Sequence, residues 1–122
     1  MNITLRKATA EDEDFVRSTH HLAYRDVVVA QFGDWDEQRQ DNYFNQKWFP
    51  EKVDLIQVEE NLTGYLIVET HPDHIFLSEI VIHPKFQNKG IGRKLLEDQS
   101  ARALAAGLPL KLRVLKANRA ID

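Results

Sequence analysis

Residues 80–96 read IVIHPKFQNKGIGRKLL and join a run of strand-forming residues to a helix through a short loop. Gly90 and Gly92 lie where the loop passes into the helix, beside the cations Lys89 and Arg93. The first amides of a helix lack intrahelical acceptors and point outward at the positive end of the helix dipole. Because glycine has no Cβ, a bulky anion can approach this backbone closely. The segment therefore predicts a phosphate or pyrophosphate cradle. An ordinary tight strand-to-helix turn remains the alternative.

The glycine spacing separates this loop from two other phosphate-binding motifs. The dinucleotide fingerprint G-x-G-x-x-G is not matched, because its third glycine would fall on Leu95. A Walker loop requires G-x-x-x-x-G-K-[ST], which the segment also lacks. If the loop binds an anion, it belongs to neither of these classes.

Outward from the loop, hydrophobic periodicity predicts strands at 2–7, 53–59, 63–70, 74–82 and 110–115, and helices from Thr9, over 36–48 and over 91–106. Thr9 is the expected N-cap of the first helix, where Phe15, Leu22 and Ala23 recur at helical spacing. The strands at 53–59 and 63–70 flank a polar turn at Glu60-Asn61 and predict an antiparallel hairpin. This order implies an α+β fold, a mixed, mostly antiparallel central sheet flanked by helices, as one domain over residues 1–122.

The composition excludes several classes of protein. Apolar residues make up 43% and charged residues 29%, which suits a buried core. A net charge of −3 argues against a general nucleic-acid binder. Neither a membrane span nor a signal peptide is evident, so we expect no membrane partner and a cytoplasmic location. The chain has no cysteine, and His20 and His21 have no partners at metal-ligand spacing, so no metal site is predicted.

Residues 80–96 closely resemble the acetyl-CoA signature of the GNAT superfamily of N-acetyltransferases. Gln87, Gly90 and Gly92 hold the defining positions, after a strand that ends in His83-Pro84. The order of the other elements is compatible with this family. The resemblance implies a GNAT-like fold that lacks the last helix and strands. It also implies transfer of an acetyl group from acetyl-CoA to a primary amine of a small molecule or protein by direct attack.

The resemblance assigns positions to the acetyl-CoA. Backbone amides of residues 88–93 are expected to hold the pyrophosphate, and residues 80–82 to bond the pantetheine arm as if it were an added strand. In this family the strand at 74–82 splays from its neighbour at 110–115 and leaves a slot for the thioester. The full set of expected cofactor-binding residues is Ile80, Val81, Ile82, Gln87, Asn88, Lys89, Gly90, Ile91, Gly92, Arg93 and Asn118.

Glu79 is the candidate catalytic base, because many family members carry an acidic residue at this point of the strand. It would accept the proton of the amine directly or through water. The equal alternative is a surface carboxylate on a half-exposed strand. His83 is a weaker candidate, since a His-Pro pair at a strand end is more often structural. A backbone N–H near Val81 or Ile82 is the expected oxyanion donor.

Aromatic and acidic residues gather at residues 31–49. In this family the corresponding region borders the acceptor pocket, and such a wall would suit a cationic amine. Packing of the second helix on the sheet explains the aromatic residues equally well.

The last seven residues, 116–122, match the start of the family's Asn-x-Ala helix. The Tyr that usually protonates the thiolate would fall beyond Asp122. A truncated chain, a half supplied by a partner chain, and a catalytically impaired acyl-CoA-binding module each fit this observation. A free sheet edge at 110–115 predicts a homo-oligomer.

Overall fold

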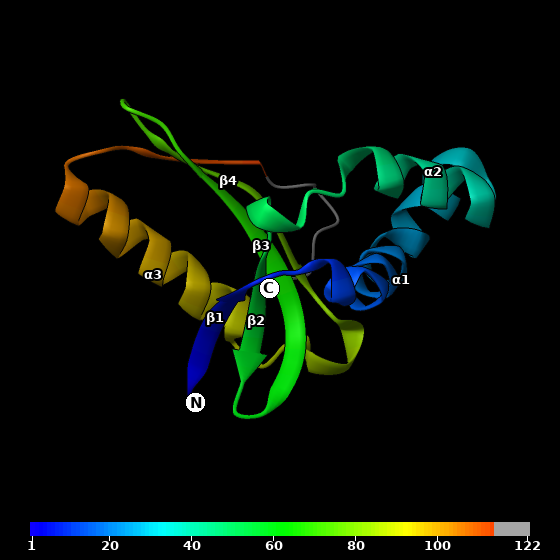
Figure 1. The fold of residues 1–122 in the computed structure, drawn as a ribbon, viewed down its shortest axis with the longest axis horizontal. Helices are drawn as coiled ribbons and strands as arrows, with labels where there is room; N and C mark the ends of the chain where they lie inside the picture. Colours follow the sequence, from blue (N-terminus) through cyan, green and yellow to red (C-terminus); the bar gives the residue numbers. More distant parts are fainter. Residues whose placement is uncertain (114–122) are drawn as a thin grey trace.

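The computed structural model describes residues 1–113 and has a five-stranded sheet flanked by three α-helices (Figure 1). The predicted α+β fold is therefore confirmed. No helix in this range is long and apolar enough to cross a membrane. The strands are β1 (Ile3–Lys7), β2 (Asp54–Val58), β3 (Asn61–Thr70), β4 (Ile75–Ile82) and β5 (Leu110–Leu112). The α-helices are α1 (Glu13–Phe32), α2 (Glu37–Lys47) and α3 (Ile91–Ala106), and the 3-10 turns are η1 (Ala10–Asp12), η2 (Pro50–Lys52) and η3 (Pro84–Phe86).

The strands lie in the order β1-β2-β3-β4-β5. The first four are antiparallel, and β5 is parallel to β4 because α3 returns the chain along one face of the sheet. The predicted hairpin of β2 and β3 is confirmed. Its turn lies one residue earlier than expected, at Glu59-Glu60, because Asn61 already pairs with Val58. Glu59 adopts the left-handed conformation, with a φ of 55°.

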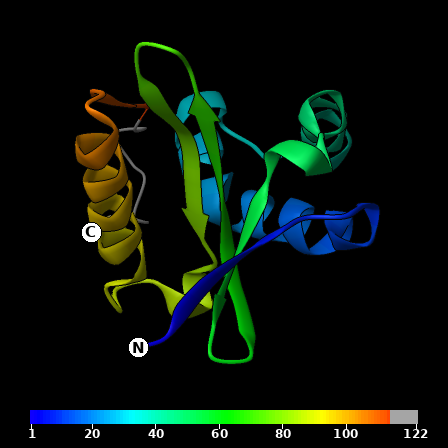
Figure 2. The same cartoon turned by 60° about the vertical axis from the view of Figure 1, so that its left-hand side comes forward.

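Two hydrophobic clusters fill the two faces of the sheet, with α3 on one side and α1 and α2 on the other (Figure 2). Successive side chains of a strand point to opposite faces, so each strand contributes to both clusters. The cluster beneath α3 contains Ile56, Leu66, Leu77, Ile80, Ile82, Ile91 and Leu95. The cluster beneath α1 and α2 contains Ala8, Val16, Phe44, Val53, Leu55, Tyr65 and Val81.

A β-bulge in β4 decides which face Glu79 occupies. On β3, Ile67 pairs with Glu79 and the next residue, Val68, pairs with Leu77, so Ser78 is an extra residue in β4. The bulge places Leu77 and Glu79 on opposite faces although they are two residues apart. Leu77 packs beneath α3, whereas Glu79 lies on the α1 and α2 side with Tyr65.

The first helix differs in detail from its prediction. Thr9 does begin a helical segment, and its N–H donates to Asp12 Oδ2 at 2.8 Å, but the segment opens as the 3-10 turn η1. Leu22 is 50% exposed, because Phe15 and Ala23 lie on the side of α1 that packs on the sheet and Leu22 does not.

The second helix is capped as its sequence suggests, since the Asp36 side chain accepts from the N–H of Arg39 at 3.1 Å. Among the aromatic residues at the end of this helix, Phe44 is buried, Trp48 is partly buried and Tyr43 is 55% exposed.

Candidate functional site

The loop before α3 presents an open, uncapped helix start. Gly90 is the N-cap in the left-handed conformation, with a φ of 84°, and no side chain caps the helix there. Asn88 is also left-handed, with a φ of 62°. The N–H of Lys94 donates to the Gly90 carbonyl at 3.0 Å, so the amides of residues 91–93 precede this first bond of the helix. A Cβ added at Gly90 would meet no atom within 4 Å, so there is open space at the helix start.

Two predicted site residues hold this loop against the end of β4. The Gln87 side-chain amide donates to the Ile82 carbonyl at 2.9 Å. His83 Nδ1 accepts from the N–H of Lys85 at 3.1 Å, and the N–H of His83 donates to the Thr63 carbonyl at 2.8 Å. These contacts favour the structural interpretation of His83 over a catalytic one. The bond from the Gln87 side chain to Ile82 holds the loop in a fixed position relative to β4.

The side chains at the end of β4 are buried in the core. Ile80 and Ile82 are buried beneath α3, and Val81 is buried on the other face. Pairing with β5 runs from Ile75 to Leu77, and Arg113 N–H adds one bond to the Leu77 carbonyl at 3.1 Å. The remainder of the predicted strand at 110–115 and the candidate Asn118 lie outside the described residues.

Glu79 is hydrogen-bonded and largely withdrawn from solvent. The hydroxyl of Tyr65, which is 2% exposed, donates to Glu79 Oε1 at 2.6 Å. Burial raises the pKa of Glu79, while the Tyr65 bond and the charges of Lys47 and Arg113 lower it. Burial and the charge of Glu79 raise the pKa of Tyr65 well above its usual value, so its hydroxyl stays a donor. The arrangement differs from that of a solvated surface carboxylate.

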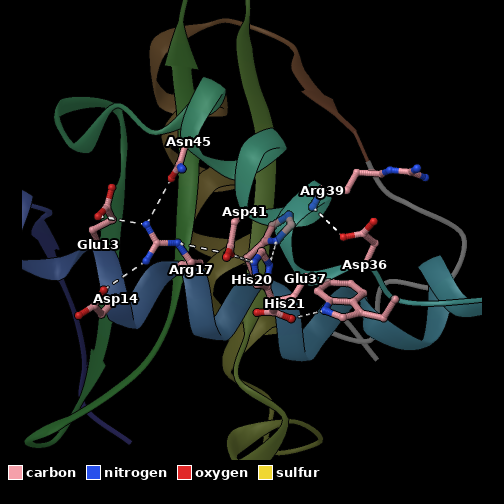
Figure 3. A network of polar contacts seen from close by, with 11 residues as sticks. Glu13, Asp14, Arg17, His20, His21, Asp36, Glu37, Arg39, Asp41 and Asn45 are labelled. Atoms are coloured by element: carbon pink, nitrogen blue, oxygen red, sulfur yellow. Dashed lines mark hydrogen bonds and ion pairs between the residues drawn. The ribbon is translucent and has the colours of Figure 1, made fainter.

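A second polar cluster joins α1 to α2, and sequence reasoning missed it (Figure 3). His21 Nε2 lies 2.8 Å from Asp41 Oδ1, and His20 Nδ1 lies 3.1 Å from His21 Nδ1. From the sequence we expected no partners at metal-ligand spacing for these histidines, and the fold brings Asp41 to His21 from the next helix. The two partners from α1 and α2 are twenty positions apart, and no short motif reports such a contact.

The aromatic residues between the helices divide into two groups. Phe44 stacks on Trp48 with ring centroids 5.6 Å apart and belongs to the core beneath α1 and α2. Phe32, Tyr43 and Phe49 are exposed. Packing therefore explains Phe44 and Trp48, whereas the three exposed rings are not part of the core.

Comparison with known proteins gives a consistent result. The acetyltransferase (GNAT) family pattern matches residues 14–121. No curated protein matches the sequence. Among solved structures, the fold is similar to the PaiA N-acetyltransferase of Thermoplasma acidophilum in complex with coenzyme A, at 18% identity and a TM-score of 0.70, over 97% of this chain and 82% of that one.

Two further structures share the fold. A ribosomal-protein-alanine N-acetyltransferase from Brucella melitensis biovar Abortus 2308 is 14% identical, with a TM-score of 0.63 over 95% of this chain and 82% of that one. The apo form of YjaB from Escherichia coli is 16% identical, with a TM-score of 0.69 over 97% of this chain and 75% of that one. At these identities the likeness concerns the fold.

Proposed function

Because the chain belongs to the GNAT acetyltransferase family, we propose that it transfers an acetyl group from acetyl-CoA to a primary amine of a small molecule or protein. The observation that carries the proposal is the start of α3, where no side chain caps the helix and there is open space at Gly90. A diphosphate fits such a site, because unpaired N–H groups and the helix dipole both favour negative charge.

Different residues around the cradle would bind different parts of acetyl-CoA. The amides of residues 91–93 would bind the pyrophosphate, and the neighbouring cations Lys89 and Arg93 add charge to the same loop. Gln87 acts as a positioning residue through its bond to Ile82. The backbone of residues 80–82 would pair with the pantetheine arm, since their side chains are committed to the core.

Glu79 would remove the proton from the attacking amine. Acetyl-CoA supplies the thioester carbonyl, and the amine must be neutral to attack it. A carboxylate with a raised pKa is a better proton acceptor than a solvated one, and the Tyr65 hydroxyl fixes one of its oxygens. A backbone N–H near Val81 or Ile82 would stabilise the developing oxyanion.

Gly90→Glu tests the donor site by placing bulk and negative charge in the cradle. Gly33→Glu is a matched control, because Gly33 has a φ of 88° against 84° at Gly90 and both positions are free of atoms within 4 Å. In a calorimetric titration with CoA, we expect at least a tenfold loss of affinity for the first variant. The control should bind like the parent chain. Equal affinity for all three proteins would refute the site.

Glu79→Gln tests the base in a thiol-release assay with a panel of amines. We expect slower transfer and unchanged CoA affinity. The Glu79 side chain lies on the face of the sheet that α1 and α2 cover, whereas the cradle lies at the start of α3. An unchanged rate at all pH values would exclude Glu79 as the base. CoA binding without thiol release for any amine would instead favour a binding module without turnover.

The sheet edge supports one further proposal, a homo-oligomer. Among the described strands β5 lies at an edge of the sheet, and Lys111 and Leu112 are exposed there. Edge strands expose unpaired N–H and C=O groups that can pair with another chain. A monomer at high concentration in size-exclusion chromatography would contradict this proposal.

A further inference from the structure

One histidine of α1 faces two carboxylates of α2 in the cluster of Figure 3. A ring nitrogen of His21 and one carboxylate oxygen each from Glu37 and Asp41 all lie within 4.8 Å of one another. We propose that these three residues bind a divalent transition-metal ion of the Zn²⁺ class, which joins α1 to the first turns of α2. This inference is independent of acetyl transfer and concerns a different part of the molecule from the cradle.

The backbone brings the three ligands to one place. Glu37 and Asp41 are four residues apart on α2 and therefore share one face of that helix. His21 is 8% exposed and is held between the rings of Trp35 and Phe44, with centroids 5.1 and 6.2 Å away. Its orientation is therefore set by packing.

The donor atoms are close to the separations that an ion would require. Zinc binds nitrogen and carboxylate oxygen at about 2.0–2.2 Å, which places neighbouring ligand atoms roughly 3–3.5 Å apart. His21 Nε2 and Asp41 Oδ1 are 2.8 Å apart, so a small rotation of the partly exposed Asp41 side chain is enough. The Trp35 indole N–H donates to Glu37 Oε2, so its other oxygen can serve as the ligand.

His20 provides the outer hydrogen bond that a metal-binding histidine needs. If His21 binds a metal through Nε2, its proton resides on Nδ1 and requires an acceptor. His20 Nδ1 lies 3.1 Å from this atom. The unprotonated nitrogen of a neutral imidazole can accept this hydrogen bond.

The charge around the site favours a cation. The polar network of Figure 3 contains the carboxylates of Glu13, Asp14, Asp36, Glu37 and Asp41 and the guanidinium groups of Arg17 and Arg39. Arg25 also lines the groove beside His21 and Glu37. The guanidinium of Arg17 lies 3.1 Å from Glu13 and 3.2 Å from Asp14, closer than its 3.7 Å contact with Asp41. Among these three carboxylates, Asp41 is therefore the one that Arg17 neutralises least.

The donor set also selects the type of ion. One imidazole with two carboxylates suits zinc or a neighbouring first-row ion, whereas magnesium and calcium prefer oxygen ligands throughout. His21 and Glu37 also line an open groove of about 310 Å³, whose other lining residues are Asp14, Arg17, Ser18, Leu22, Arg25 and Trp35. Water can therefore reach the remaining coordination positions.

Zinc titration of the chelator-treated 122-residue chain tests the site by calorimetry. We expect one ion per chain, with affinity at least tenfold weaker in His21→Gln and in Glu37→Gln. Glu37 is exposed, so its variant keeps the fold even if the buried His21 variant does not. His74→Gln is the matched control, because His74 also contacts a carboxylate, that of Asp73, at 2.7 Å, and stacks on His71.

The proposal is overturned if the folded chain does not bind zinc, if Glu37→Gln binds it like the parent chain, or if His74→Gln abolishes binding. A CoA titration in chelator should be unaffected, which separates failure of this site from failure of the proposed acetyltransferase activity.

Discussion

Tyr65→Phe removes one hydroxyl from the base site and should change stability in a pH-dependent manner. The hydroxyl donates to Glu79 Oε1 at 2.6 Å within the protein core. A hydrogen bond to a charged group contributes about 1.5–3 kcal/mol, and one between neutral groups about 1 kcal/mol. The bond lowers the pKa of Glu79 and so stabilises the ionised carboxylate. Its contribution is therefore largest above that pKa and declines as the pH falls and Glu79 is protonated.

We expect Tyr65→Phe to lower the free energy of unfolding by about 2 kcal/mol near pH 8 and by about 1 kcal/mol near pH 4. Urea denaturation at both pH values measures the difference. Tyr43→Phe is the matched control, because Tyr43 is exposed, and its loss should stay within about 0.5 kcal/mol. An equal loss for Tyr65→Phe at the two pH values would refute the proposed coupling. In an active enzyme, the apparent pKa of the acid limb of the rate profile should rise, because Glu79 loses the hydrogen bond that lowers its pKa.

Two further substitutions test features of the fold. Gly64→Ala should lower the free energy of unfolding, measured by urea denaturation, by at least about 2 kcal/mol. The Cβ of the alanine would lie 2.1 Å from the Val81 carbonyl oxygen, so two strands would have to separate. Native stability would contradict this close approach. His20→Gln should remove an acid sensitivity. The pKa of His20 is lowered to about 4 by burial and by His21 and Lys47. The parent chain in chelator should therefore lose up to about 3 kcal/mol as the pH falls from about 6.5 to 4. Identical urea midpoints for parent and variant across this range would disprove the shift.

Local sequence determined most of the elements, because their signals lie within a few neighbouring residues. The helix at 91–106 was predicted with both ends correct, since a glycine loop precedes it and Gly107 adopts the left-handed conformation that ends it. The cradle was predicted for the same reason. Its glycines, its cations and the helix start are adjacent in the chain, so no tertiary contact is needed to bring them together.

Tertiary structure decided where the side chains of the two polar sites point. Strict alternation would place Leu77 and Glu79 on one face, and only the register of β4 against β3 reveals the bulge at Ser78 that separates them. The contact of His21 with Asp41 depends on how α1 packs against α2, twenty positions apart. Propensities and caps act over one turn of chain, whereas register and helix packing depend on the whole core. For this reason the sequence alone was sufficient to predict the cradle, whereas the environment of Glu79 and the histidine cluster required the tertiary structure.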